Sequence, residues 1–427
     1  MKILLLGSGG REHALAWKIK QSPLCEELYI APGNAGTSAC GTNIPLSDSD
    51  IDGIKEFIVT HNINMLVVGP EQPLVMGIYN NLREDSAINK DIIIIGPSEE
   101  GAKLEGSKNF AKEFMKRHNI PTAAYQTFTA DTLKEGYAFL QRLHPPYVLK
   151  ADGLAAGKGV IICNELHEAQ SVLESMLVEG QFGAASNQVV IEQFLTGIEL
   201  SVFVLTDGQS YVILPCAKDY KRIGEGDTGL NTGGMGAVSP VSFADARFMD
   251  KVEQRIIIPT IKGIQKENIN YKGFIFFGLM NVWGDPFVIE YNVRLGDPET
   301  EAILPRMTND LVELFIAVGN QTLHSMQINI IPESAATVML VSGGYPADYE
   351  KGKIIYNMET IENSLVFHAG TKHNEAGDLI TAGGRVLTVT SLGKNIKSAV
   401  VLSNQNAEKI KFENKQYRKD IGKDLML

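Results

Sequence analysis

A carboxylate and an amide, two residues apart, close one of the long apolar segments of the chain. Glu290 and Asn292 flank Tyr291 in a stretch that reads as a β-strand, where alternate side chains point to the same face. A carboxylate and an amide oxygen together suit a hard cation such as Mg²⁺, which binds few protein oxygens and fills its shell with phosphate oxygens and water. The pattern predicts a metal site at Glu290 and Asn292 beside a phosphorylated ligand.

Three further charged residues, Arg294, Asp297 and Glu299, follow closely after that strand. Burying such charge without partners is costly, so the cluster favours a site over the alternative of a solvated loop. If the strand runs on through Arg294, the i, i+2, i+4 spacing puts Arg294 on the same face as Glu290 and Asn292. We expect Arg294 to stabilise charge in a transition state there.

Two lysines and a glycine-rich loop have the composition of a phosphate site. Lys108 lies in a predicted helix, and Lys150 ends a predicted strand that runs directly into the loop 151–159. Glycines let backbone amides approach phosphate oxygens, and a lysine adds charge. The loop lacks the G-x-x-x-x-G-K-[ST] pattern of a P-loop, and a flexible surface hairpin is the alternative on local grounds. The nucleotide contacts expected in this region are Lys108, Lys150, Gly153, Gly157, Lys158 and Gly159.

A second group of candidate nucleotide contacts follows the predicted strand 189–192. Glu192, Phe194 and Leu195 are placed where main-chain groups read an adenine base, and Glu199 is placed to bind ribose hydroxyls. Taken alone this signal is weak, because a glutamate after a strand is common.

The first glycine-rich loop, 7–10, follows the first predicted strand and opens a helix, so its amides and the helix dipole form an anion site. A dinucleotide fingerprint requires G-x-G-x-x-G, but Glu12 stands at the third glycine position. The second predicted strand also ends, at 31–34, without the acid that binds an adenosine ribose. A single phosphate or a phosphoribosyl group therefore fits better than a dinucleotide. The alternative is a tight turn that binds no ligand.

The elements that position these residues begin with an alternation of short apolar runs, at 2–6, 28–30, 65–68 and 92–95, and helical patterns. This alternation predicts an open parallel Rossmann-like sheet with crossover helices. Ligands in such sheets bind at the carboxyl ends of the strands, where Glu71 is placed to meet a hydroxyl or an amine. A loop carboxylate in water is the alternative for Glu71.

The length of 427 residues suggests about three domains at roughly 150 residues each. We expect an α/β and α+β multidomain fold. The predicted units are an N-terminal domain at 1–103, a central domain at 104–327 with a lid at about 122–190, and a small mixed α/β domain at 328–427. There is no internal repeat.

Composition excludes several classes of protein. The net charge of −11 argues against a nucleic-acid partner, because a phosphate backbone attracts basic surfaces. The four cysteines, Cys25, Cys40, Cys163 and Cys216, are spaced too irregularly for a disulfide framework or a zinc site. No apolar stretch approaches the ~20 residues of a membrane span, and the N-terminus does not resemble a signal peptide. We expect a cytoplasmic protein that binds neither nucleic acid nor membrane.

In the order of its parts, the chain resembles the ATP-grasp carboxylate–amine ligases, and its specific strings resemble the phosphoribosylamine–glycine ligase family over nearly the whole length. No single string is decisive, but so many in one order are highly specific. The strings are Gly7–Ala14, Ala31–Gly36, Gly69–Glu71, Leu104–Lys108, Lys150–Gly159, Asn231–Ala237, Arg294 with Gly296–Thr300, Phe367–Thr371, Gly383–Val386 and Arg418–Gly422.

The resemblance implies an ATP-dependent joining of glycine to phosphoribosylamine through glycyl phosphate, with Mg²⁺ (or Mn²⁺) as the metal, in a monomer or weak dimer. Asp297 would hold the glycine ammonium, and Arg294 would act with it in catalysis. Many ATP-grasp enzymes carry a third metal-binding acid on the preceding strand, but the stretch 278–281 has none. The expected substrate-binding residues are Gly9, Gly10, Asn34, Gly36, Glu71, Asp297 and Thr300.

Three rival functions stay open at this point. One is another ATP-grasp ligase of purine synthesis, acting on a different amine or on bicarbonate; the string 296–300 and the long final domain weigh against it. A dinucleotide-dependent oxidoreductase is disfavoured by Glu12. A non-catalytic nucleotide-binding module is disfavoured because Lys108, Lys150 and the pair Glu290 and Asn292 are all present.

Overall fold

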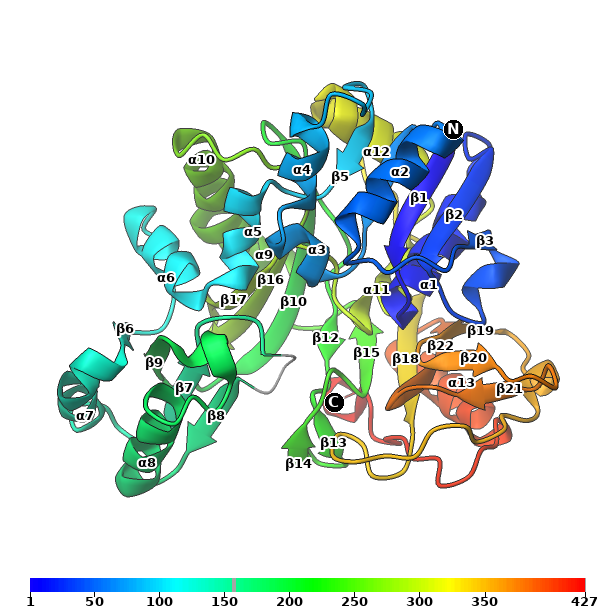
Figure 1. Cartoon of the computed structure of the whole chain (residues 1–427). Coiled ribbons are helices and arrows are strands. Elements are labelled where there is room, and N and C mark those ends of the chain that lie inside the picture. Colours follow the sequence, from blue (N-terminus) through cyan, green and yellow to red (C-terminus); the bar gives the residue numbers. More distant parts are fainter. Residues whose placement is uncertain (156–158, 427) are drawn as a thin grey trace.

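The structure, a computed structural model, describes residues 1–155 and 159–426. The chain begins with a five-stranded parallel sheet of order β3-β2-β1-β4-β5, which confirms the predicted open parallel sheet (Figure 1). Its strands are β1 (Lys2–Gly7), β2 (Glu27–Pro32), β3 (Thr42–Asn43), β4 (Met65–Val68) and β5 (Ile93–Ile95). The helices between them are α1 (Gly10–Lys20), α2 (Ile51–His61), α3 (Glu71–Val75) and α4 (Ile78–Glu84).

Two helices, α5 (Glu99–Gly106) and α6 (Lys108–Arg117), lead from this sheet to a separate small unit. That unit is a four-stranded antiparallel sheet of order β6-β9-β7-β8 with its own apolar core. It stands apart at the lower left of Figure 1 and lies largely within the segment 122–190, whose role as a lid stays a prediction. Its elements are β6 (Tyr125–Phe128), α7 (Leu133–Leu140), β7 (Tyr147–Ala151), β8 (Val160–Cys163), α8 (Leu166–Leu177) and β9 (Val189–Gln193).

The second central sheet is antiparallel, with order β11-β10-β16-β17. Its long strands alternate between two apolar cores, so both of its faces are covered. The strands are β10 (Ile198–Thr206), β11 (Tyr211–Ile213), β16 (Gly273–Val282) and β17 (Asp285–Asn292). The helices around it are α9 (Ala246–Val252), α10 (Ile258–Lys266), α11 (Glu299–Ile303) and α12 (Leu311–Asn320).

A fourth sheet, of five strands in the order β12-β15-β18-β22-β19, forms the C-terminal unit, with α13 (Ile396–Lys409) packed on β18 and β22. This sheet crosses the boundary predicted at 327, because β12 (Lys218–Asp219) and β15 (Gly236–Ser239) leave the central region and extend it beside β18. Its other strands are β18 (Ser334–Val341), β19 (Ser364–His368) and β22 (Arg385–Gly393). Two hairpins complete the chain, β13 (Arg222–Gly224) with β14 (Thr228–Asn231) and β20 (Thr371–His373) with β21 (Leu379–Thr381).

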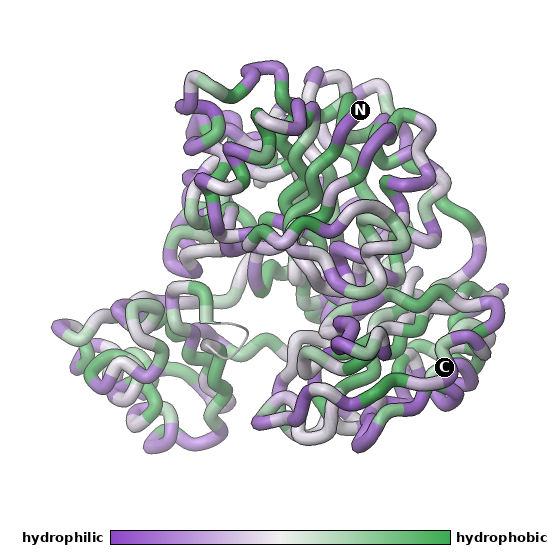
Figure 2. Tube along the Cα trace, turned by 45° about the vertical axis from the view of Figure 1, so that its right-hand side comes forward, coloured by the Kyte–Doolittle hydropathy of each residue, from purple (hydrophilic) through white to green (hydrophobic). Residues whose placement is uncertain are grey.

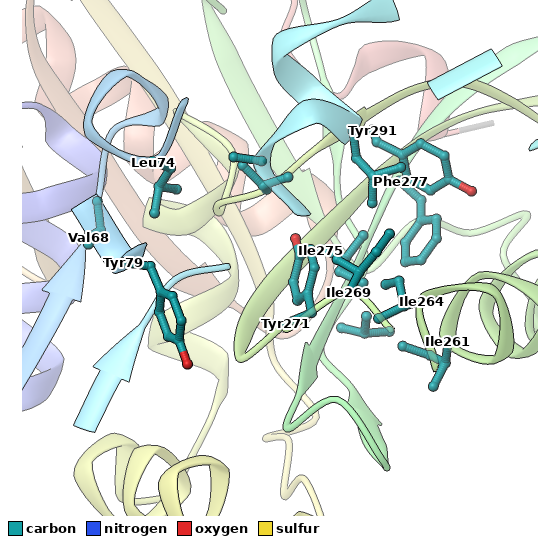
Figure 3. Close-up of a cluster of buried hydrophobic side chains, with 14 of the residues drawn as sticks. Val68, Leu74, Tyr79, Ile261, Ile264, Ile269, Tyr271, Ile275, Phe277 and Tyr291 are labelled. Carbon is teal, nitrogen blue, oxygen red and sulfur yellow. The ribbon is translucent and has the colours of Figure 1, made fainter. Parts of the chain in front are cut away.

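The N-terminal and central units share their cores. Alternate residues of β1 enter different clusters, with Leu4 and Leu6 on one face and Ile3 and Leu5 on the other. Figure 2 shows apolar segments inside the units and polar segments toward the outside. The first cluster runs without a break from the parallel sheet to β16, β17 and α10, as the labelled side chains in Figure 3 show. The two units therefore hold the site between them on one continuous core.

Candidate active site

The end of β17 presents Glu290 and Asn292 on one face, as their spacing predicts. Tyr291 between them points the other way, into the core beside Phe277, with ring centroids 5.5 Å apart (Figure 3). Gly278 lies opposite Glu290 in β16, and a Cβ there would come within 3.0 Å of the Glu290 Cγ. A glycine at this position leaves room for the carboxylate.

The strand does not run on through Arg294, so the condition for placing Arg294 on the same face is not met. β17 ends at Asn292, and the chain bends at Val293 and Arg294. The bend is fixed by a carboxylate from α5, because the Val293 amide donates a hydrogen bond to Glu105 Oε2 at 2.7 Å. Arg294 therefore does not extend the face shared by Glu290 and Asn292, and tertiary contacts set its direction instead.

Glu290 is an ionised acid among cations. Burial alone would raise its pKa, but the nearby positive charges of Lys221, Lys150, Lys108 and Arg294 outweigh burial and hold the pKa below its usual range. Among the residues that the structure describes, the Glu290 carboxylate forms no hydrogen bond or ion pair. A charged carboxylate that is not paired inside the protein is suited to an external cation, and the surrounding positive charge is suited to phosphates.

The residues present fit a divalent metal ion. Asn292 lies beside Glu290, and its buried side-chain Nδ2 has no hydrogen-bond partner within the described chain. Over residues 1–155 and 159–426, no group of three or more His, Cys, Asp or Glu side chains is arranged to hold a metal. The protein's share of a metal shell would therefore rest on Glu290 and Asn292, with the remaining ligands from phosphates and water.

Lys150 is fixed by a buried glutamate. Its Nζ lies 2.8 Å from Glu192 Oε1, and Lys112 of α6 holds the other oxygen, Oε2, at 2.8 Å. Burial would raise the pKa of Glu192, but the two lysines outweigh it and lower that pKa. Burial lowers the pKa of Lys112 to about 8, against the opposing effect of Glu192. Lys150 also donates to the Ile289 carbonyl at 3.2 Å, which ties β7 to β17.

The loop after β7 is tied to the start of α6. Lys108 Nζ donates to the Gly153 carbonyl at 3.1 Å, and the Asn109 amide donates to Asp152 Oδ1 at 2.7 Å. The two predicted phosphate contacts Gly157 and Lys158 lie outside the described residues. The structure thus brings Lys108, Lys150 and the flanks of the glycine loop together.

The segment predicted to read adenine joins two sheets. Phe194 and Leu195 connect β9 to β10 and are half-buried. Glu199, at the start of β10, forms an ion pair with Lys221 at 3.1 Å. Since Lys221 also acts on Glu290, it lies between the predicted ribose and metal positions.

The loop before α1 holds a carboxylate of its own. Glu12 folds back so that its Oε2 accepts a hydrogen bond from the Gly9 amide at 2.6 Å, while Oε1 pairs with Arg11 Nε at 2.6 Å. A Cβ at Gly7 or Gly69 would meet the Glu12 side chain at 2.5 Å or less. Glu12 therefore uses an amide that a dinucleotide pyrophosphate would need at this helix terminus.

Arg294 lies between carboxylates from two different helices. Its Nη2 is 2.9 Å from Glu105 Oε1 on α5, and its Nε is 3.3 Å from Glu71 Oε2 at the start of α3. Burial would raise the pKa of Glu71, but Arg294 and Arg11 outweigh it and lower that pKa. Arg294 thus connects the predicted metal site at the end of β17 with the predicted amine site at Glu71.

Asp297 meets the C-terminal unit. Arg385 of β22 reaches its carboxylate, with Nη1 3.1 Å from Oδ1, and also donates to its main-chain carbonyl at 2.8 Å. The Arg11 amide points to Asp297 Oδ2 at 3.5 Å. Residues from all three predicted domains therefore converge on this carboxylate.

Three family models match the chain in order: the Phosphoribosylglycinamide synthetase N domain over residues 1–105, its ATP-grasp (A) domain over 106–300, and its C domain over 335–424. A phosphoribosylamine–glycine ligase from Yersinia pestis is 44% identical over 427 residues, covering 99% of this chain and 98% of that protein. One from Chlorobaculum tepidum is 45% identical over 430 residues, covering 99% of both chains. The chain belongs to the phosphoribosylamine–glycine ligase family.

A solved phosphoribosylamine–glycine ligase from Thermotoga maritima has the same fold, with a TM-score of 0.86 and 37% identity over 99% of this chain and 100% of that one. The biotin carboxylase of Campylobacter jejuni shares the fold at a TM-score of 0.72 and 14% identity, covering 98% of this chain and 93% of that one. The predicted resemblance, the multidomain ATP-grasp fold and the assignment to the carbon–nitrogen ligases are confirmed. Membership of a family with an ATP-grasp domain also supports the use of ATP with a divalent metal.

Several residues predicted to bind the ligase's substrates are engaged within the protein. Asn34 donates to the carbonyls of Ser8 and His368 at 2.7 and 2.8 Å, and accepts from two amides of its own loop. Gly36 has a packing role, because a Cβ there would lie 2.3 Å from the His13 ring. The Thr300 hydroxyl donates to the Gly296 carbonyl. These residues shape the loops, and their direct contact with substrate stays a prediction.

Sequence reasoning missed the partners that lie around the ligase's predicted site residues. Glu105, Lys112, Lys221 and Arg385 each touch or surround a predicted site residue from a distant part of the chain. The only local signal was that Glu105 and Arg385 fall within strings that resemble the family. No spacing rule connects residues that are 88 to 189 positions apart, such as Asp297 with Arg385 or Glu105 with Arg294.

Proposed function

We propose that the chain joins glycine to 5-phosphoribosylamine at the expense of ATP, giving glycinamide ribonucleotide, ADP and phosphate in de novo purine biosynthesis. One observation carries the proposal: Arg294 joins a cation-rich phosphate site to an acid-lined amine site. A ligase that activates a carboxylate with ATP and then transfers it to an amine needs these two sites in contact. The family membership of the full chain supports the same reading.

In the first step, a glycine carboxylate oxygen attacks the γ-phosphorus of ATP. An O–P bond forms, the bond to ADP breaks, and glycyl phosphate results. Phosphoryl transfer is mostly positioning and charge neutralisation. Lys108 and Lys150 supply positive charge toward the phosphates, and Arg294 stabilises charge that develops during transfer.

We infer that Glu290 and Asn292 hold Mg²⁺ (or Mn²⁺) against the ATP phosphates. The ion would neutralise phosphate charge and orient the γ-phosphoryl group. The ionised, unpaired Glu290 carboxylate supports this assignment, since its negative charge is not used inside the described protein.

The rest of the nucleotide would lie along the segment between β9 and β10. Main-chain groups of Glu192, Phe194 and Leu195 would read adenine, and Glu199 would bind the ribose hydroxyls. Gly153, Gly157, Lys158 and Gly159 would cover the phosphates. The Glu192 carboxylate is paired with Lys112 and Lys150, so Glu192 would contact adenine through its main chain.

In the second step, the amine of phosphoribosylamine attacks the glycyl carbonyl and phosphate leaves with the electrons of the C–O bond. Asp297 would hold the glycine ammonium, so that this amine does not compete as the nucleophile. Glu71, at the carboxyl end of β4, would orient the attacking amine or the ribose hydroxyls. Gly9, Gly10, Asn34, Gly36 and Thr300 would shape the phosphoribosyl site.

The test is a steady-state assay of ADP release in the presence of Mg²⁺. Full turnover should require both glycine and phosphoribosylamine. Full activity with bicarbonate, or with aminoimidazole ribonucleotide as the amine, would assign the chain to a sister ATP-grasp ligase instead. Tight NAD binding by calorimetry, competed by no phosphoribosyl compound, would contradict the reading of the first glycine loop.

We expect the enzyme to work in the cytoplasm as a monomer or weak dimer, on small molecules and without a nucleic-acid partner. All four cysteines are free, which is consistent with a reducing compartment. In the described part of the chain, no helix combines the length and apolarity that a bilayer span requires.

A further inference from the structure

We propose that Glu105 is a positioning residue for the ligase reaction: it holds Arg294 in the direction that phosphoryl transfer requires. The inference rests on the proposed function, and it concerns a side chain that is not itself in contact with the predicted substrates. Glu105 lies in the last turn of α5, and only 7% of its side chain is exposed.

The two carboxylates beside Arg294 are not equivalent. Glu105 Oε1 lies 2.9 Å from Nη2, whereas Glu71 Oε2 lies 3.3 Å from Nε, and Nε makes no hydrogen bond to any described residue. The Glu71 side chain is 34% exposed. Glu71 is therefore free to turn toward an amine or a hydroxyl, while Glu105 stays with Arg294.

The second oxygen of Glu105 holds the backbone next to Arg294. The Val293 amide donates to Oε2 at 2.7 Å, just beyond the end of β17. One carboxylate thus fixes both the guanidinium and the bend that carries it. Arg294 Nη1 also donates to the Leu295 carbonyl at 3.2 Å, so the side chain is held from two directions.

The segment that carries Glu105 also carries a predicted phosphate ligand. Three residues later, Lys108 opens α6, and the intervening Ser107 caps that helix by accepting a hydrogen bond from the Phe110 amide at 3.0 Å. The corner between α5 and α6 therefore sets Lys108 toward the phosphates and Glu105 toward Arg294 as one rigid piece. This arrangement fixes the position of Lys108 relative to that of Arg294.

Stability alone does not account for a charged group at this position. Burial raises the pKa of Glu105, and the positive charge of Arg294 opposes that rise. Placing an ion pair out of water costs desolvation energy that its attraction often only offsets, so a neutral pair would hold the fold as well. However, a hydrogen bond to an ionised carboxylate fixes a guanidinium more firmly than a hydrogen bond to a neutral acceptor does.

A double-mutant cycle tests the proposal. Glu105→Gln, Arg294→Ala and the double variant are compared for kcat with glycine, phosphoribosylamine and ATP, and for KM of ATP. Glu105→Gln should lower kcat by roughly ten- to a hundredfold and leave KM for ATP within about twofold, because the loss falls on the transition state. In the Arg294→Ala background the same change should alter kcat by less than about twofold. Glu100→Gln, in an exposed pair with Lys103 on the same helix, is the matched control.

Equal losses from Glu105→Gln in both backgrounds would overturn the proposal, and so would a loss of kcat that follows the loss of folded protein in thermal melts. If Glu105→Gln does not fold, Glu105→Asp keeps the charge but shortens the reach, and should lower kcat in the same coupled way. A wild-type protein without glycine- and phosphoribosylamine-dependent turnover would refute the proposed function itself. An active wild type with additive variants would refute the role of Glu105 alone.

Discussion

Glu290 is ionised at a position where burial opposes ionisation, and four surrounding cations provide the compensation. Glu290→Gln removes the charge but keeps the size of the side chain. Removal of one well-placed charge-stabilising group typically costs ~3 kcal/mol, so kcat should fall on the order of a hundredfold or more. A higher concentration of Mg²⁺, or Mn²⁺ in its place, should restore part of the activity, because the defect of the variant is a lower affinity for the metal.

The measurement is kcat as a function of metal concentration, with thermal melting as the control for folding. Normal turnover of Glu290→Gln at low Mg²⁺ would show that Glu290 is not a metal ligand. A fall in melting temperature that matches the loss of activity would instead assign a structural role to the end of β17.

Glu301 is a buried acid whose pKa is raised, in contrast to that of Glu290. It is fully buried in α11, and neither carboxylate oxygen has a hydrogen-bond partner among the described residues. Burial, and then the negative charge of Asp297, raise its pKa well above the usual range, so the folded protein favours the neutral carboxyl group. A raised folded pKa means that stability is greatest below the unfolded pKa and is lost as pH rises.

Glu301→Gln should therefore keep the wild-type kcat and unfold at a higher temperature than wild type, with a gap that widens from pH 5 to pH 8. Melting curves across this range provide the measurement. A stability gap that does not change with pH, or a variant that is less stable at pH 8, would show that Glu301 is ionised in the folded state.

At the scale of the elements, we expect the segment 122–190 to act as a lid that closes over ATP. Its sheet encloses its own core, separate from the shared core of the other units. Closing over ATP would exclude water from an acyl phosphate that water hydrolyses. We expect hydrogen exchange in the segment 122–190, including the loop 153–159, to slow when a non-hydrolysable ATP analogue binds. Exchange that is the same with and without the analogue would exclude a lid.

Local pattern predicted the elements and the shared strand face of Glu290 and Asn292, whose role as metal ligands stays a prediction. Alternation within β17 was enough to place Glu290 and Asn292 together, because strand geometry over three residues is local. The same rule failed at Arg294, where a hydrogen bond from Val293 to Glu105 bends the chain. Glu105 precedes Val293 by 188 residues, and no local pattern reports such a partner.

At the scale of the whole molecule, the C-terminal unit docks on the N-terminal one through two neutral histidines. The His368 amide donates to His13 Nδ1 at 2.7 Å, which requires that nitrogen to be unprotonated. Burial lowers the pKa of His13 to about 3 and that of His368 to about 4. This contact joins residues 355 positions apart, and no local pattern in the sequence reports it.

His13→Asn keeps an acceptor near the position of Nδ1 but does not titrate. Because the folded pKa lies below the unfolded value of 6.5, wild-type stability should fall as pH decreases from about 6.5 toward 4. One proton of difference adds about 1.4 kcal/mol per pH unit to the slope of the free energy of unfolding, and His13→Asn should lose that contribution. The exposed His324→Asn is the control. Equal slopes for wild type and His13→Asn in urea titrations would contradict the assignment.

The distribution of charged residues among the units explains how an acidic chain can form a positively charged site. In a protein of net charge −11, four cations from α6, β7, the segment between β12 and β13 and the bend after β17 surround Glu290, and we expect them to bind phosphates. The acids proposed to bind the attacking amine and the glycine ammonium come from α3 and from the turn before α11, respectively. Neither set is visible as a run of charge in the sequence, since each unit contributes one or two residues.

In the proposed mechanism, glycine is activated as glycyl phosphate before the amine attacks. The most direct measurement follows oxygen. Glycine labelled with ¹⁸O in its carboxylate is turned over with ATP and phosphoribosylamine, and the inorganic phosphate is analysed by mass spectrometry. The mechanism predicts one ¹⁸O atom in each phosphate released, because a carboxylate oxygen attacks the γ-phosphorus and leaves with it. Unlabelled phosphate from an enzyme that still forms glycinamide ribonucleotide would contradict the account.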